Sequence, residues 1–371
     1  MISRTRLARI SASVATVIAI GIAGSLAGAT AASAAKSKSV VEKPAGGTIT
    51  ETGSTLLYPL FNLWAGGYST MFPSTTVSTA GTGSGTGITD ASNGTADIGA
   101  SDAYLSPTQL TATPSLLNIP VAISAQIIAY NIPGVTQHIV LSGAVLSNIY
   151  QGKVTTWNDP SIEALNPGIT LPSIPIVTIH RSDGSGDTFL FTTYLSDQDP
   201  NGWGKSIGYN TTVNWPAAPG AQAQQGNSGM VSGCKATPGC VAYVGISYLT
   251  QALQAGLGYA ELKNGKGQIE LPTAAAITAE ASAFVKKTPA NGTISLIDGK
   301  VSGGYPIINY EYAIVNSQQS SSSTAKNIRS VLEWAIEPKD GNSPSYLAQV
   351  NFQPLPAKIV TASLKQIHKI Q

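Results

Sequence analysis

The sequence predicts an α/β fold, because segments with strand-like and helix-like patterns alternate along the chain. The run Val121–Tyr130 (VAISAQIIAY) is almost continuously apolar and has strand length, which is typical of a strand buried in a sheet. Within Thr55–Tyr68, Leu56, Leu60 and Leu63 recur at helical spacing. Together these patterns favour mostly parallel sheets covered by helices.

The other elements are expected from the same periodicities. Strands are predicted at Gly47–Thr50, Thr75–Ala80, Ile176–His180, Val241–Ile246 and Ile307–Val315. Helices are predicted at Leu141–Tyr150, Thr188–Leu195, Ala274–Lys286 and Lys326–Ile336. No internal repeat is visible in the sequence, which makes a repeat architecture a poor fit.

The N-terminal residues 1–35 have the layout of a secretory signal peptide. Three arginines precede the uncharged run Ile10–Ala29, and Ala32-Ser33-Ala34 gives a small-x-small cleavage pattern. We expect cleavage after Ala34 or Ala35, then a flexible tail over residues 36–45, and hence an exported mature protein. No cysteine lies near this point for lipid attachment, and a retained membrane anchor is the alternative.

The composition limits the classes of function. Of the 371 residues, 21 are basic and 19 acidic, and only 11% are charged. Once the three arginines of the signal peptide are set aside, 18 basic residues face 19 acidic ones, so no positive excess is left to bind nucleic acid through its phosphates. His138, His180 and His368 are not at metal-ligand spacing, and we expect neither a metal nor a cofactor.

Both cysteines lie in one short segment, Cys234-Lys-Ala-Thr-Pro-Gly-Cys240. Pro238-Gly239 supplies a turn between them, and an exported chain meets an oxidising compartment. The sequence therefore favours a local disulfide. A pair of metal-binding thiolates is the alternative, but it lacks further ligands.

Three glycine-rich turns stand directly before predicted helices, at residues 52–55, 81–87 and 183–187. A helix N-terminus presents unpaired N–H groups, and glycine lets an anion approach that backbone closely. The serine and threonine residues of these turns add hydroxyl donors. The turns could therefore converge on one small anion. The alternative is that each is an ordinary capping turn.

Arg181 and Asp102 add the charged groups that such a site needs. Arg181 precedes the third turn, and its guanidinium offers a planar fork of donors to an oxyanion, while Asp183 could orient it. An ionised Asp102 only accepts hydrogen bonds, so it would bind the O–H of hydrogen phosphate and disfavour sulfate. The alternatives are a surface salt bridge for Arg181 and a helix N-cap for Asp102.

Long motifs match one protein family over almost all of the mature chain. They include TGSTLLYPLFNLWA (52–65), GTGSGTGI (81–88), IGASDAYLS (98–106), HRSDGSGDTFLF (180–191), VAYVGISYL (241–249) and NFQPLP (351–356). Through these motifs the chain resembles the PstS family, the phosphate-binding proteins that feed bacterial phosphate ABC importers.

The resemblance implies a two-lobed periplasmic-binding-protein fold of type II, with mixed sheets flanked by helices and crossover strands as a hinge. The first lobe is expected from residues 46–130 and 302–371, and the second from residues 131–301. Closing the two lobes on a ligand is the motion that this architecture implies.

The resemblance also implies the residues that bind phosphate. These are Thr55, Leu56, Ser84, Asp102, Arg181, Asp183, Ser185, Gly186 and Asp187. Asp187 is a departure, because many family members have threonine there. Its carboxylate must turn away from the ligand or accept a second phosphate proton.

The function expected from the resemblance is non-enzymatic capture of inorganic phosphate by an extracytoplasmic monomer, which passes it to membrane permease subunits. A binding protein for sulfate, molybdate or another oxyanion is one alternative. A secreted phosphatase with Ser84 or Ser185 as nucleophile is another, but neither serine lies in a Gly-x-Ser-x-Gly elbow.

Overall fold

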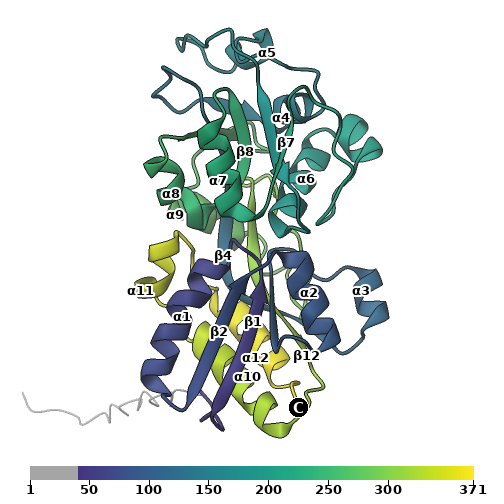
Figure 1. Ribbon diagram of the computed structural model, residues 1–371, viewed down its shortest axis with the longest axis vertical. Coiled ribbons are helices and arrows are strands. Elements are labelled where there is room, and N and C mark those ends of the chain that lie inside the picture. The colour runs from purple at the N-terminus through teal and green to yellow at the C-terminus, as the bar shows by residue number, and fades with distance from the viewer. Residues whose placement is uncertain (1–40) are drawn as a thin grey trace, which may run out of the picture. The chain divides into compact units, whose positions relative to one another are not determined.

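A computed structural model describes residues 41–371 (Figure 1). The predicted signal peptide, residues 1–35, and residues 36–40 of the predicted tail lie outside the described residues. The expected alternation of strands and helices is present throughout the described part.

The elements have the following bounds. The strands are β1 Gly47–Gly53, β2 Thr75–Gly81, β3 Ile98–Ser101, β4 Leu116–Tyr130, β5 Val140–Ser142, β6 Val177–Arg181, β7 Gln222–Gln224, β8 Cys240–Gly245, β9 Gly258–Tyr259, β10 Glu261–Lys263, β11 Ile269–Glu270 and β12 Ile308–Asn316. The α-helices are α1 Tyr58–Met71, α2 Ser84–Asn93, α3 Pro107–Ala112, α4 Gly143–Tyr150, α5 Pro160–Glu163, α6 Gly186–Gln198, α7 Gly226–Ala236, α8 Leu249–Gln254, α9 Ala274–Ser282, α10 Ser322–Ile336, α11 Pro344–Leu347 and α12 Ala357–Ile367. Three short helical turns are Pro200–Gly204, Ile246–Tyr248 and Ala348–Val350.

The main sheet runs in the order β2-β1-β3-β12-β4-β8-β6-β7, with β9 also paired to β4. The long strand β4 divides this path. Its residues 116–125 pair with β12, and residues 126–130 pair with β8. We call β2, β1, β3 and β12 with their helices the first half, and β8, β6 and β7 with theirs the second half. Figure 1 shows α1 and α2 beside the strands of the first half and α6 and α7 beside those of the second.

The expectation of mostly parallel sheets is wrong at the centre of this path. β1 runs parallel to β2 and β3, and β6 runs parallel to β7 and β8. β12, however, is antiparallel to β3 and β4, and β4 is antiparallel to β8. β4 leaves the first half and β12 returns to it, so the two lie side by side in opposite directions. The mixed sheets flanked by helices that the resemblance implies are therefore confirmed.

The pairing of the strands does not by itself define the predicted lobe boundaries. β4 changes partners between Ala125 and Gln126, within the predicted first segment 46–130. The boundaries at 130 and 302 remain predictions.

Residues 41–45 of the predicted tail lie against α10. The main-chain N–H of Glu42 donates to Glu333 Oε2 at 2.6 Å, and Arg329 Nε donates to Glu42 Oε2 at 2.8 Å. These bonds connect the start of the described chain to a helix far along the sequence.

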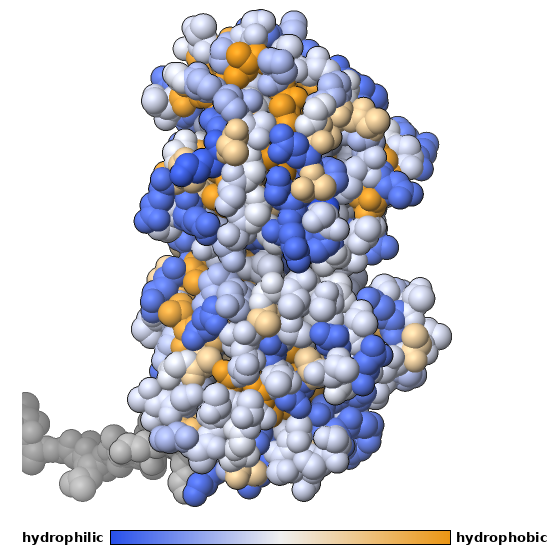
Figure 2. Space-filling model, in the orientation of Figure 1, coloured by the Kyte–Doolittle hydropathy of each residue, from blue (hydrophilic) through white to orange (hydrophobic). Residues whose placement is uncertain are grey.

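The apolar core follows the sheet through both halves. The run Val121–Tyr130 is buried along its whole length, as its continuous apolar pattern predicts. On the face seen in Figure 2, hydrophobic residues are scattered among polar ones. Among residues 41–371, none of the helices combines the length and apolarity that crossing a membrane requires.

Candidate functional site

The three predicted glycine-rich turns follow the carboxyl ends of strands. The turn at 52–55 follows β1, that at 81–87 follows β2, and that at 183–187 follows β6. This is where open α/β sheets place their ligands. The main-chain N–H of Gly85 donates to the carbonyl of Gly184 at 2.9 Å, so turns from the two halves are in direct contact.

Asp102 lies at the end of β3 and is surrounded by hydroxyl donors of the first half. Ser54 Oγ donates to its Oδ1, and Ser84 Oγ to its Oδ2 at 3.3 Å. The amide of Asn309, on β12, donates to its main-chain carbonyl at 3.2 Å. The carboxylate is buried and accepts from both of these hydroxyls, in keeping with an acceptor role.

The alternative role of Asp102 as a helix N-cap is not observed. The next helix, α3, is capped by Ser106, whose hydroxyl accepts from the N–H of Gln109 at 3.2 Å. Asp102 stands four residues earlier, against the turns rather than at a helix start.

Arg181, at the end of β6, is buried rather than part of a surface salt bridge. Its Nε donates to Asp183 Oδ1 at 2.7 Å, and its Nη2 donates to Asp183 Oδ2. Its Nη1 donates to Asp187 Oδ2 at 3.0 Å. Asp183 thus orients the guanidinium, as the sequence suggested, and the remaining edge faces Asp187.

The side chain of Asp187 turns inward, towards donors of its own half. Besides Arg181, it accepts from Asn227 Nδ2 at 2.6 Å and from Gln126 Nε2 at 3.1 Å. The carboxylate of Asp187 therefore faces the guanidinium of Arg181. Whether it turns away from a bound anion or accepts a second phosphate proton stays a prediction.

The charges of the site are unbalanced, because one guanidinium faces two carboxylates and a third, Asp102, lies nearby. Burial, reinforced by the charge of Asp187, raises the pKa of Asp102. Burial also raises the pKa of Asp187 against the opposing effect of Arg181. Burial and the charge of Asp102 raise the pKa of Glu311, on β12, well above its ordinary value. The site therefore favours bound protons over additional negative charge.

The remaining predicted residues hold the turns in place. Ser185 caps α6, since its hydroxyl accepts from the N–H of Thr188 at 3.3 Å. Gly186 packs on Asp102 so closely that a Cβ atom would lie 2.4 Å from its Oδ2. Thr55 Oγ1 accepts from Asn227 Nδ2 at 3.0 Å, and the carbonyl of Leu56 accepts from Ser247 Oγ at 2.7 Å. All nine predicted residues are thus brought to one place between the halves.

Several site residues were missed by the sequence prediction. Asn227 links Thr55 to Asp187. It lies in the first turn of α7, whose sequence Gly226-Asn227-Ser228-Gly229 is rich in glycine like the three predicted turns. Gln126 and Glu311 are buried polar residues in largely apolar strands, and such residues are candidates for a functional role. Ser54 lies in the first predicted turn, but only the fold shows that it, and not Thr55, reaches Asp102.

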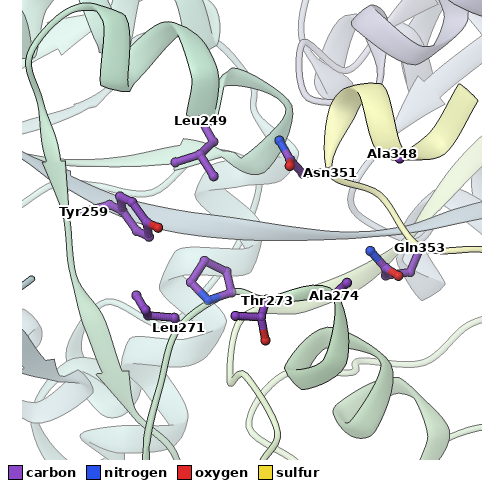
Figure 3. A pocket seen from close by; sticks show the side chains of 9 residues that line it. Leu249, Tyr259, Leu271, Thr273, Ala274, Ala348, Asn351 and Gln353 are labelled. Carbon is purple, nitrogen blue, oxygen red and sulfur yellow. The ribbon is translucent and has the colours of Figure 1, made fainter. Parts of the chain in front are cut away.

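Two pockets lie near the contact between the halves. One, of about 350 Å³, borders the site and is lined by Thr55, Tyr58, Gly226 and Tyr248 among others. Figure 3 shows the second, of about 280 Å³, where Leu249 and Tyr259 of the second half face Asn351 and Gln353. Neither pocket has a charged side chain among its lining residues, and only the first includes a predicted site residue, Thr55.

The cysteines and His180 have structural roles. Cys234 and Cys240 form the predicted disulfide, with their Cα atoms 5.3 Å apart. His180 stacks on Trp215, with ring centres 4.8 Å apart, and its Nδ1 contacts the carbonyl of Arg181 at 3.1 Å. Burial lowers the pKa of His180. These contacts give His180 a packing role beside the site.

Comparison with known proteins identifies the family. A family model described as a PBP superfamily domain matches residues 38–339. The phosphate-binding protein PstS of Xylella fastidiosa is 30% identical over 313 residues, which cover 84% of this chain and 82% of that protein. PstS of Methanocaldococcus jannaschii is 32% identical over 350 residues, covering 89% and 88%. The chain belongs to the PstS family.

Solved structures show the same fold for this PstS family member. A phosphate-binding protein from Stenotrophomonas maltophilia superposes with a TM-score of 0.62 at 21% identity, covering 86% of this chain and 94% of that one. An ABC-type phosphate transport receptor from Vibrio cholerae gives 0.52 at 17% identity, covering 83% and 100%. The two-lobed type II fold expected from the sequence is thereby confirmed. The PstS family is a family of binding proteins, in agreement with the expectation of a non-enzymatic chain.

Proposed function

We propose that this PstS family member is an extracytoplasmic receptor that captures inorganic phosphate and delivers it to the membrane subunits of an ABC importer. The names of its relatives support the ligand, and the name of the receptor from Vibrio cholerae supports the transport role. The predicted signal peptide supports export. Delivery to a permease and a monomeric state are part of this proposal.

The observation that carries the proposal is the meeting of helix N-termini from both halves beside the guanidinium of Arg181 and the buried carboxylate of Asp102. In the proposed complex, phosphate lies between the two halves and contacts groups of both. The first half supplies Thr55, the N–H of Leu56, Ser84 and Asp102, and the second supplies Arg181, Ser185 and the N–H groups of Gly186 and Asp187. Such donors suit a tetrahedral oxyanion because each helix N-terminus offers N–H groups and a partial positive charge.

The excess of carboxylates selects a partly protonated anion. Arg181 is already shared between Asp183 and Asp187, so a fully ionised anion would add charge to an acidic cluster. Hydrogen phosphate can donate its O–H to Asp102, whereas sulfate would place an unprotonated oxygen against that carboxylate. Asp187 either accepts a second phosphate proton or gives up its bond to Arg181 when the anion binds.

Calorimetric titration of ligand-stripped protein with phosphate and with sulfate tests this proposal. We expect phosphate to bind far more tightly. Asp102→Asn removes the charged acceptor for the phosphate O–H, so phosphate should bind about 10-fold to 100-fold more weakly. The amide N–H can donate to an unprotonated oxygen, so the ratio of phosphate affinity to sulfate affinity should also fall. Asp90→Asn, in helix α2 of the same half, is the matched control and should behave as wild type.

Three outcomes would contradict the proposal. Tighter binding of sulfate or molybdate would assign the site to another oxyanion. An unchanged phosphate-to-sulfate ratio in Asp102→Asn would remove the role of the carboxylate. Sustained turnover of p-nitrophenyl phosphate would show a phosphatase instead.

A further inference from the structure

Five lysines gather on a surface away from the anion site, and we call this surface the basic face. They are Lys286, Lys287, Lys358, Lys365 and Lys369, all exposed. Three hydrogen bonds connect parts of this surface. Lys358 Nζ donates to the carbonyl of Lys286 at 3.2 Å. Gln366 donates to the carbonyl of Ala290 at 2.6 Å and accepts from Lys369 Nζ at 2.9 Å.

The basic face is formed by two segments without a single acidic residue, 281–297 and 343–371. All 19 acidic residues of the chain lie elsewhere. Residues 41–371 carry 16 basic residues, so 11 remain outside the basic face against those 19 acidic ones. The described chain therefore has a strong charge asymmetry, with a local positive surface on an otherwise negative protein.

An apolar pocket of about 310 Å³ opens within the basic face. Its lining residues are Thr288, Pro289, Ala290, Lys358, Ile359, Thr361, Ala362 and Lys365. The two lysines stand one helical repeat of seven residues apart on α12, so they lie along the same side of the helix. Long lysine stems add apolar surface beneath their charged ends.

We propose that the basic face docks on a membrane surface that bears anionic phospholipids. The ammonium groups pair with the headgroup phosphates, and the apolar pocket receives the glycerol and upper acyl region of one lipid. Docking of this kind is peripheral and reversible, with electrostatic attraction and a small apolar contact as its two contributions. It would hold the receptor near membrane subunits without involving the anion site.

The pocket is what favours a lipid over a soluble polyanion. A polyanion such as polyphosphate would use the lysines but has no apolar part to enter a pocket lined by Ile359, Pro289 and two alanines. An amphiphilic anion satisfies both features at once. None of the residues of the basic face belongs to the proposed phosphate site, so the two proposals stand or fall separately.

Flotation with phospholipid vesicles tests the proposal on the mature chain. We expect binding to vesicles that contain phosphatidylglycerol, little binding to pure phosphatidylcholine, and weakening with salt. In Lys358→Glu/Lys365→Glu the partition coefficient should fall at least about 25-fold, from about fivefold for each lysine lost near the surface. Lys153→Glu/Lys205→Glu, exposed lysines of the second half, make the same charge change and should bind nearly as wild type.

The outcomes separate the alternatives. Both double variants should titrate phosphate as wild type does, which shows that they are folded. Equal loss of vesicle binding in both would mean that net charge matters and not the basic face, and would overturn the proposal. Binding of polyphosphate without binding of anionic vesicles would also overturn it, in favour of a polyanion surface.

Discussion

The two halves of the candidate site differ in the charged groups that they contribute. The first half surrounds a single carboxylate, Asp102, with the uncharged hydroxyls of Ser54 and Ser84. The second half holds the cation, but it pairs Arg181 with Asp183 and Asp187. Under the proposed function, the first half would sense whether an oxyanion carries a proton, and the second would supply positive charge. The comparison then assigns selectivity and affinity to opposite sides of the proposed site.

The largest effect is expected when the charge of the second half is removed. Arg181→Ala should weaken phosphate binding at least about 100-fold, because truncating one partner of a buried, hydrogen-bonded charge pair costs about 2–5 kcal/mol of binding free energy. Calorimetry measures the loss, and thermal unfolding checks that the variant folds. Arg181→Lys keeps the charge but not the planar fork and should show an intermediate affinity.

The matched control for Arg181→Ala is Arg329→Ala, which breaks a partly exposed ion pair with Glu42. It should leave phosphate affinity unchanged. If the two variants bind phosphate equally well, the division of roles between the halves is wrong.

A smaller effect is expected from the extra carboxylate of the second half. Asp187→Asn keeps an acceptor for Gln126 and removes one negative charge beside Arg181. Phosphate affinity of the wild type should fall as the pH rises through the second phosphate pKa, because the site carries more carboxylates than cations. The variant should lose most of this dependence and bind about 10-fold more tightly at alkaline pH, since a one-unit pKa effect corresponds to 1.36 kcal/mol. A pH profile parallel to that of the wild type would show that Asp187 has no part in proton selection.

The smallest effect concerns an ionisable group of the second half outside the site. Glu280, on α9, accepts from the N–H of Gly299 at 2.5 Å, and burial raises its pKa to about 7. Because the folded state holds this proton more tightly than the unfolded state, the stabilisation is complete below the ordinary pKa of 4.5 and is lost as the pH rises through about 7. Glu280→Gln should flatten the pH dependence of unfolding by about 1 kcal/mol.

Urea unfolding at several pH values measures this change, with the exposed Glu163→Gln as control. Phosphate binding by Glu280→Gln should keep the pH profile of the wild type. A change in that profile would mean that a carboxyl group outside the site also affects the pH dependence of phosphate binding. The assignment of this dependence to the site carboxylates would then be wrong.

Much of the site could be predicted because its signals are local. A glycine-rich turn before a helix exposes N–H groups whatever surrounds it. The turns at 52–55, 81–87 and 183–187 could therefore be predicted as candidate anion-binding turns. Arg181 and Asp102 stood out as charges next to such turns in a chain with few charges. The glycine-rich start of α7, residues 226–229, carries a similar signal, and Asn227 could have been found from it.

Other features depend on which residues meet across the sheet. The antiparallel arrangement of β4 and β12 contradicts the local alternation pattern because β4 leaves the first half and the chain returns to it through β12. No periodicity records the direction of a crossover. The same holds for Gln126, which reaches Asp187 only because β4 changes partners at that residue.

The sequence by itself determined the alternating elements, the turns that can hold an anion and the types of charged group beside them. These follow from backbone conformation and hydrophobic periodicity, which act over a few residues. Only the tertiary structure decided that Ser54 reaches Asp102 and that Asp187 turns to Arg181. It also decided that acid-free segments from two distant parts of the chain form one basic face. Such contacts join residues far apart in the chain, and their energies depend on burial and on neighbours that no local pattern specifies.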